Sequence, residues 1–319
     1  MKTLKLGIMG MSPGNGHPYS WAAICNGYDK KAMAGCPFPV IPQYLAKQDP
    51  ATMRLEGTVV THIWTQDKKI SKHVAAASLI ENIVDDATDM IGKVDAIILA
   101  RDDGENHLPM AKPFIEACVP ILIDKPLTDR EDDLRQFVKY YEQGKIIMSC
   151  SSARFSRSVL ELKKKNNLGK ILTANGVSPK YWRTYGIHLI EAIYAVMGGG
   201  IESAQNVGKK DEEIVHLQYK DGRHAVLQTF AHITSGNMFF YGEKGCQETG
   251  DSDAFFQFKN MISHFVGWLR TSRPPFDWRE TIETVKIVIA GEKSLAEGGR
   301  IVRLDEIAPL TRMEGKNHV

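Results

Sequence analysis

The chain has 319 residues, of which 43% are hydrophobic and 24% charged, with a formal net charge of +2 at pH 7. This balance is typical of a globular protein large enough for two domains, and it favours neither nucleic acid nor an anionic membrane as a partner. No apolar run approaches the roughly 18 to 20 residues that span a bilayer, and the N-terminus lacks a signal-peptide pattern, so we expect a cytoplasmic protein.

In the first half, short apolar runs alternate with helical stretches, which predicts βαβ units and a parallel sheet. The predicted strands are 4–9, 58–64, 96–100, 120–123 and 146–149, and the predicted helices are 69–79 and 108–118. We therefore predict an α/β dinucleotide-binding (Rossmann) domain with a doubly wound parallel sheet over residues 1–150.

Residues 10–57 separate the first two predicted strands, whereas a whole βαβ unit needs only about thirty residues. The excess, roughly 28–57, is rich in proline. We interpret it as an inserted loop near the site or the subunit interface, because long loops in compact domains are usually functional or disordered.

The second half predicts an α+β domain with a mainly antiparallel sheet over residues 151–319, serving substrate binding and oligomerisation. Its predicted strands are 172–177, 214–219, 224–233 and 238–241, and its predicted helices are 187–197, 255–270 and 278–297. Asp221-Gly222 is a strong hairpin-turn signal between two of these strands.

A glycine-rich turn follows the first predicted strand. Gly10, Gly14 and Gly16, with Ser12 and Asn15 between them, would let the backbone approach a pyrophosphate at a helix N-terminus. The spacing differs from Gly-x-Gly-x-x-Gly, so a plain strand-to-helix turn remains the alternative.

Cofactor choice is poorly marked in the sequence. The second strand ends near Thr65, where an acid usually binds the adenosine ribose, and the nearest acid is Asp67. Lys68 and Lys69 would hold a 2′-phosphate or simply begin a solvated helix. NAD and NADP both stay open.

The run from Val119 to Leu127 ends an apolar strand in Asp124, Lys125 and Pro126. Such a lysine stands at the carboxyl edge of the sheet, where open α/β sheets bind ligands, and the proline stops the strand. Lys125 is therefore the first candidate for chemistry, with a surface lysine as the alternative.

Four segments resemble the glucose–fructose oxidoreductase/inositol dehydrogenase (Gfo/Idh/MocA) family. Residues 123–127 are similar to the family's Glu-Lys-Pro motif with Asp124 in place of the glutamate, and residues 100–107 are similar to its Asn-x-x-His approach to that motif. Residues 152–155 with 168–171 resemble the opening of the family's second domain, and residues 186–191 resemble its Gly-x-His-x-x-Asp helix.

The resemblance implies an NAD- or NADP-dependent enzyme that transfers a hydride between the nicotinamide and a secondary alcohol of a sugar, cyclitol or sugar derivative. It implies that Lys125 hydrogen-bonds the reacting oxygen and the cofactor, and that His188 is the general acid/base, since imidazole titrates near neutral pH. It adds His107 to the cofactor site, and a homodimer or homotetramer formed through the C-terminal sheet.

The chain also departs from the family pattern. Thr184 stands where an aspartate often precedes the histidine by four residues. Arg101 replaces a small polar residue at a strand end, where it would pair with a cofactor phosphate, a substrate carboxylate or the neighbouring acids Asp102 and Asp103.

Aromatic residues with an arginine lead into the His188 helix, as Tyr181, Trp182 and Arg183. With Arg154 and Thr184 they form the predicted substrate-binding set and suggest an anionic or nucleotide-linked substrate. The segment 17–21 would face the same cleft. Packing between the domains is the alternative for both aromatic groups.

Two other functions stay open. One is a lyase, glycosidase or epimerase that uses tightly bound NAD for transient oxidation, and the other is a catalytically silent dinucleotide-binding sensor. Neither disulfides nor a metal site are predicted, because the five cysteines are scattered and no His or Cys ligand spacing links separate elements.

Overall fold

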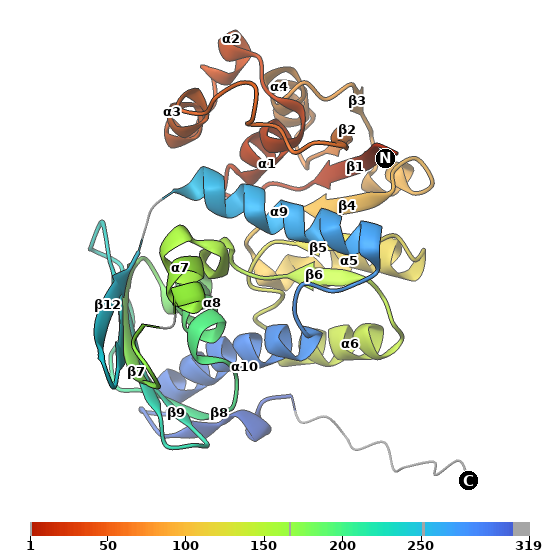
Figure 1. The fold of residues 1–319 in the computed structure, drawn as a ribbon. Coiled ribbons are helices and arrows are strands. Elements are labelled where there is room, and N and C mark those ends of the chain that lie inside the picture. Colours follow the sequence, from red (N-terminus) through yellow and green to blue (C-terminus); the bar gives the residue numbers. More distant parts are fainter. Residues whose placement is uncertain (1, 166, 251–252, 309–319) are drawn as a thin grey trace.

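Two β-sheets organise the computed structural model, which describes residues 2–165, 167–250 and 253–308 (Figure 1). Sheet A has six strands, all from residues 4–149, and sheet B has seven strands from residues 171–303. This arrangement confirms the predicted fold class, a Rossmann α/β domain followed by an α+β domain. We propose the boundary near residue 150, between the last strand of sheet A and the first of sheet B.

Sheet A is parallel throughout, with the order β3-β2-β1-β4-β5-β6. The order reverses beside β1, so the crevice at the carboxyl ends of β1, β4 and β5 is where such a sheet binds ligands. Its strands are β1 (Leu4–Met9), β2 (Thr58–Trp64), β3 (Asn82–Ile83), β4 (Ala96–Leu99), β5 (Ile121–Ile123) and β6 (Ile147–Ser149).

Helices cover both faces of sheet A, as its fully buried strands require. On one face the core joins Ile98 and Leu122 to α1, α4 and α9, and on the other it joins Ile97 and Leu99 to α5 and α6. These helices are α1 (His17–Asn26), α4 (Lys68–Ala77), α5 (His107–Glu116), α6 (Glu131–Glu142) and α9 (Ala254–Thr271). Helix α9 comes from the second half of the chain and lies along the first sheet (Figure 1).

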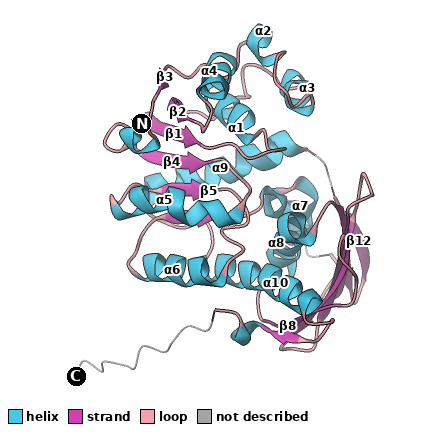
Figure 2. Ribbon diagram, turned by 180° about the vertical axis from the view of Figure 1, so that it is seen from behind, coloured by secondary structure: helices cyan, strands magenta, loops and turns pink. Residues whose placement is uncertain are grey.

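Sheet B has the order β12-β11-β7-β10-β9-β8-β13 and is antiparallel except between β7 and β10. One face packs on helices, and the other is open in Figure 2. Its strands are β7 (Ile171–Pro179), β8 (Ile201–Asn206), β9 (Glu212–Tyr219), β10 (His224–Phe230), β11 (Met238–Gly242), β12 (Gly245–Thr249) and β13 (Val302–Arg303). The helices are α7 (Arg157–Lys165), α8 (Ile187–Met197) and α10 (Trp278–Ala296). Asp221-Gly222 turns β9 into β10, as predicted.

The inserted segment 28–57 is not the plain loop we expected, because it contains α2 (Lys30–Met33) and α3 (Val40–Ala46). Both helices stand at the end of the molecule beside α1 and α4 (Figure 2). The sequence prediction also missed α6, α7, β8 and β12. Among the described residues, no helix is both long and apolar enough to cross a membrane.

Candidate active site

A cavity of about 380 Å³ opens at the carboxyl edge of sheet A. Its walls come from the β1–α1 turn, the segment around α3, the ends of β4 and β5, the region around α8 and one side of α9. The polar lining includes His17, Asp102, Asp124, Lys125 and His188. The crevice predicted by the strand order is therefore closed over by the second domain and the inserted segment.

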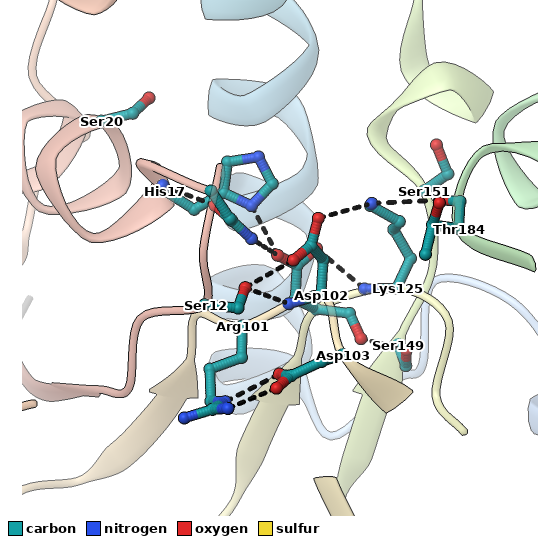
Figure 3. A network of polar contacts seen from close by, with 12 residues as sticks. Ser12, His17, Ser20, Arg101, Asp102, Asp103, Lys125, Ser149, Ser151 and Thr184 are labelled. Atoms are coloured by element: carbon teal, nitrogen blue, oxygen red, sulfur yellow. Dashed lines mark hydrogen bonds and ion pairs between the residues drawn. The ribbon is translucent and has the colours of Figure 1, made fainter. Parts of the chain in front are cut away.

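Lys125 is held at the centre of this edge and is 4% exposed. Its Nζ lies 3.5 Å from Oδ2 of Asp102 and 3.5 Å from the carbonyl oxygen of Thr184 (Figure 3). The ring of Tyr185 is 5.2 Å away. Burial alone would raise the pKa of Asp102, but Lys125 and the Ser12 hydroxyl outweigh it and hold that pKa below its ordinary value.

His188 stands in the wall of the same cavity, near the start of α8. Its Nδ1 is 2.6 Å from the Ser151 hydroxyl, and Tyr185 meets its ring edge-on at 5.0 Å. Desolvation first, then the positive charge of Lys125, lowers the pKa of His188 well below its ordinary value. The imidazole is therefore neutral at pH 7.

Asp124 lies beside Lys125 and carries two partners from the glycine-rich turn. Its Oδ2 accepts a hydrogen bond from Nδ2 of Asn15 at 3.0 Å and lies 2.5 Å from Nδ1 of His17. Sequence reasoning placed His17 only in an aromatic group near the cleft. A histidine at the first helical position after a glycine turn was the one signal that could have singled it out.

The β1–α1 turn retains features that a dinucleotide requires. Gly10 has φ +79°, and a Cβ there would lie 2.6 Å from Arg101, so glycine is needed for the turn. Gly14 also has φ +79°, and a Cβ there would meet nothing within 4 Å, so the space before this backbone is open. The nearby acid Asp102 is paired with Lys125 and Ser12. The turn therefore fits a pyrophosphate approaching its backbone at Gly14.

Other members of the predicted glycine loop have different partners. The Ser12 hydroxyl bonds Asp102 (Figure 3), and Asn15 bonds Asp124. A Cβ on Gly16 would lie 2.5 Å from the ring of Phe38, so this glycine lets the inserted segment pack on α1. Its need for glycine is explained by packing and not by a phosphate.

Three further predicted cofactor residues are occupied within the protein. Arg101 binds Asp103 through two nitrogens, which is the ion-pair alternative left open by the sequence (Figure 3). His107 is fully buried, with its ring nitrogens 3.1 and 2.9 Å from the carbonyl oxygens of Leu127 and Arg101. Thr65 bonds Ser71 and the backbone of Asp67. In the structure these side chains bond to neighbouring groups at the strand ends around the cleft, and their role at the cofactor stays a prediction.

Two predicted substrate residues belong to the core instead. Arg154 is 6% exposed and pairs with Glu191 at 2.6 Å and Glu280 at 3.0 Å. Trp182 has no exposed surface and donates its Nε1–H to the carbonyl of Val288 at 3.0 Å. Neither side chain lines this cavity, and their role as substrate ligands stays a prediction.

The remaining three substrate candidates line a neighbouring cavity of about 370 Å³. Tyr181 is 50% exposed, and Arg183 donates to Asp129 at 2.6 Å. Thr184 also lines this cavity, and its carbonyl oxygen accepts a hydrogen bond from Lys125. Gly14 and Lys180 line both cavities, so the two spaces adjoin along the turn.

Apolar side chains form the far wall of the main cavity. The inserted segment supplies Phe38, Ile41 and Tyr44, and α9 supplies Phe258 and Met261. The insertion therefore lies beside the candidate site, which is one of the two places that the sequence left open. A ligand that fills the cavity meets charged and imidazole groups at one end and aromatic rings at the other.

Residues 42–151 match the family described as "Oxidoreductase family, NAD-binding Rossmann fold". This match confirms the resemblance to the Gfo/Idh/MocA family. It also confirms, at the level of cofactor class, the prediction of NAD or NADP. The match begins at residue 42, after the glycine-rich turn and within the inserted segment, which are the parts of the Rossmann domain where the chain departs furthest from the family pattern.

Solved structures share the fold over both domains. A probable dehydrogenase from Thermotoga maritima is 15% identical, with a TM-score of 0.74, covering 95% of this chain and 100% of its own. A putative myo-inositol dehydrogenase from Sinorhizobium meliloti 1021 is 14% identical, with a TM-score of 0.73 and coverage of 95% and 100%. Scyllo-inositol dehydrogenase from Lactobacillus casei, solved with NAD(H) and scyllo-inositol, is 14% identical, with a TM-score of 0.74 and coverage of 95% and 99%. At these identities the likeness establishes the fold, and no curated protein matches the chain.

Proposed function

We propose that the protein is an NAD- or NADP-dependent oxidoreductase that interconverts a secondary alcohol and a ketone on a sugar, cyclitol or related polyol. The observation that carries the proposal is the meeting of Lys125 and His188 in one cavity, next to the open backbone of Gly14. These groups lie at the sheet edge where a dinucleotide's reactive end is expected.

The bound nicotinamide would supply the hydride chemistry, and the protein must bind the alcohol and manage its proton. The Lys125 ammonium donates a hydrogen bond to the reacting oxygen and stabilises negative charge as it develops there. His188, a neutral imidazole at pH 7, forms a second hydrogen bond to the same oxygen. Burial of Lys125 strengthens its interaction because water is largely excluded.

The shape of the cavity suggests a substrate with two unlike ends. Hydroxyl groups would meet Lys125, His188 and Asp102, and a ring face or an apolar substituent would pack on the aromatic wall. Because Arg154 and Arg183 are paired with carboxylates of the protein, an anionic substituent would be bound instead by Lys180, which lines both cavities.

The test is calorimetric titration of the purified protein with NAD, NADH, NADP and NADPH, followed by absorbance at 340 nm with scyllo-inositol, myo-inositol and common sugars. We expect micromolar binding of one cofactor pair and hydride transfer with a polyol, lost in Lys125→Met. Binding of none of the four nucleotides would refute the proposal. Co-purified NAD with product formation but no net redox change would favour the lyase or epimerase alternative.

We also propose that the protein is a homodimer or homotetramer formed through the open face of sheet B. The strands on that face carry partly exposed apolar side chains beside polar ones. The apolar set is Val177, Ile214, Val226, Phe230, Phe239 and Tyr241. An apolar patch of this kind on a flat sheet is typical of a protein–protein interface.

A further inference from the structure

A second histidine stands at the polar end of the cavity, outside the pair described above. His17 begins α1, and its Nδ1 lies 2.5 Å from Oδ2 of Asp124 at the end of β5. The same oxygen accepts from Asn15, and Oδ1 accepts from the backbone N–H of Lys125 at 2.8 Å. Asp124 is 2% exposed. Its carboxylate is therefore buried, bonded on both oxygens and fixed in place.

Two aromatic side chains fix the imidazole ring of His17. Trp21 stacks on it with centroids 4.5 Å apart and an angle of 14°, and Phe258 of α9 meets it edge-on at 5.0 Å. Because Nδ1 faces Asp124, Nε2 points away from that carboxylate. His17 lines the cavity, with 19% of its side chain exposed.

The two histidines of the cavity differ in their partners. A carboxylate that accepts from Nδ1–H leaves a lone pair on Nε2 and stabilises the imidazolium that forms when Nε2 takes a proton. His17 has such a carboxylate. His188 has the Ser151 hydroxyl instead, and desolvation and Lys125 lower its pKa, which makes it a poor proton acceptor.

We propose that His17, oriented by Asp124, is a catalytic acid–base group of this site, a role that rests on the proposed oxidoreductase function. In the oxidation, Nε2 takes the hydroxyl proton, the C–H electron pair leaves with its hydrogen as hydride to the nicotinamide, and the C=O bond forms. In the reduction, Nε2–H returns the proton to the same oxygen. Lys125 and His188 then bind the oxygen. The carboxylate that the resemblance expects at position 184 is replaced in function by Asp124 acting through His17.

The other titratable groups that line the cavity come from every wall: Tyr44 of α3, Asp102 at the end of β4, Asp124 and Lys125 at the end of β5, Cys150 after β6, Lys180 after β7, and Tyr185 and His188 beside α8.

The first test does not need a substrate. Diethyl pyrocarbonate acylates an imidazole nitrogen only when that nitrogen is unprotonated and accessible, and peptide mapping by mass spectrometry locates the product. We expect acylation of His17 at pH 7. The exposed His232 supplies the internal reference rate. No acylation of His17 while His232 reacts would overturn the proposal, because Nε2 would then be unavailable as a base.

The second test is kinetic and uses whichever polyol and cofactor the screen above identifies. His17→Asn keeps a donor toward Asp124, so α1 stays anchored, and it should lower kcat by about 100-fold or more and remove the acid limb of the pH profile. His232→Gln is the matched control and should leave both unchanged. If His17→Asn keeps kcat within threefold of wild type and the acid limb of the pH profile is unchanged, the contact between His17 and Asp124 is structural and the proposal is wrong.

The two proposals fail in different ways. If no nicotinamide nucleotide binds, the oxidoreductase function fails, while acylation still shows whether His17 is an accessible base. If a nucleotide binds and a polyol is oxidised without any contribution from His17, the function stands and this inference fails. Cofactor affinity of His17→Asn within threefold of wild type would show that a loss of kcat is not a loss of binding.

Discussion

Replacing Arg154 by methionine tests whether this arginine holds the protein together or grips the substrate. Its guanidinium lies 2.6 Å from Glu191, 3.0 Å from Glu280 and 4.1 Å from the ring of Phe276. Glu191 is 1% exposed, so Arg154→Met would leave a carboxylate buried without a cation. Removing one partner of a buried pair costs about 3–5 kcal/mol.

The expected shift in melting temperature follows from the size of the chain. At about 2.1 cal/mol/K per residue, unfolding 319 residues gains about 0.7 kcal/mol/K of entropy, so the loss corresponds to about 4–8 °C. Differential scanning calorimetry measures it. Arg279→Met, which breaks a pair whose arginine is 71% exposed, is the control and should cost less than about 1 kcal/mol. Arg154→Met combined with Glu191→Leu should recover much of the loss.

The pH dependence of the stability of Arg154→Met gives an independent test of the same reasoning. Burial raises the pKa of Glu191 even with Arg154 present, and removing the arginine raises it further. The folded variant then binds a proton that the unfolded chain releases, so stability is retained in acid and lost as pH rises through the folded pKa. The loss of unfolding free energy in Arg154→Met, relative to wild type, should therefore be smaller at pH 5 than at pH 8. A variant as stable as wild type at both pH values but with a raised KM would refute this reasoning and restore Arg154 as a substrate ligand.

Four further outcomes follow from the structure. Gly16→Ala should lower the free energy of unfolding by about 1–3 kcal/mol in chemical denaturation, because a Cβ there lies 2.5 Å from an aromatic ring of the inserted segment. Gly267→Ala, in the middle of α9 with nothing within 4 Å of its Cβ, should instead stabilise by about 0.5–1 kcal/mol. In Lys125→Met, the NMR titration midpoint of His188 should move to higher pH, since a positive charge that lowers its pKa is gone. Val226→Lys on the open face of sheet B should reduce the mass measured by light scattering to that of a monomer.

Sequence patterns predicted the elements with the strongest periodicity. Strand β2 has the predicted bounds, because its apolar and β-branched residues sit between clear breaks. Helix α6 was missed although Leu134, Phe137, Val138 and Tyr141 repeat at helical spacing and are all buried in it. Strand β8, with the sequence IESAQN, has no such signal, and its pairing with β9 rather than its own composition makes it a strand.

The residues of the candidate site also separate into those that sequence patterns could predict and those that they could not. Lys125 and His188 could be found because each stands at a position set by a motif, and the fold brings both to one cavity. The fates of Arg154 and Trp182 could not be predicted, because the same side chains serve an anion site or a core equally well. The role of such a side chain depends on its partners in the fold, and the partners of Arg154 are 37 and 126 positions away in the chain.

Three departures from the family pattern lie close together, around Asp124 and Lys125. The motif glutamate is replaced by Asp124, the expected acid at 184 is a threonine, and the glycine-rich turn carries Asn15 and His17. In the structure, the carboxylate of Asp124 binds both residues of the turn, and Thr184 offers Lys125 only its backbone oxygen. Taken separately, each change argues for a lost activity. Taken together, and with His17 as the proposed acid–base group, they would add an acid and an imidazole at the junction of β5 and α1 to the His188 that α8 retains, so that proton transfer no longer needs an acid at position 184.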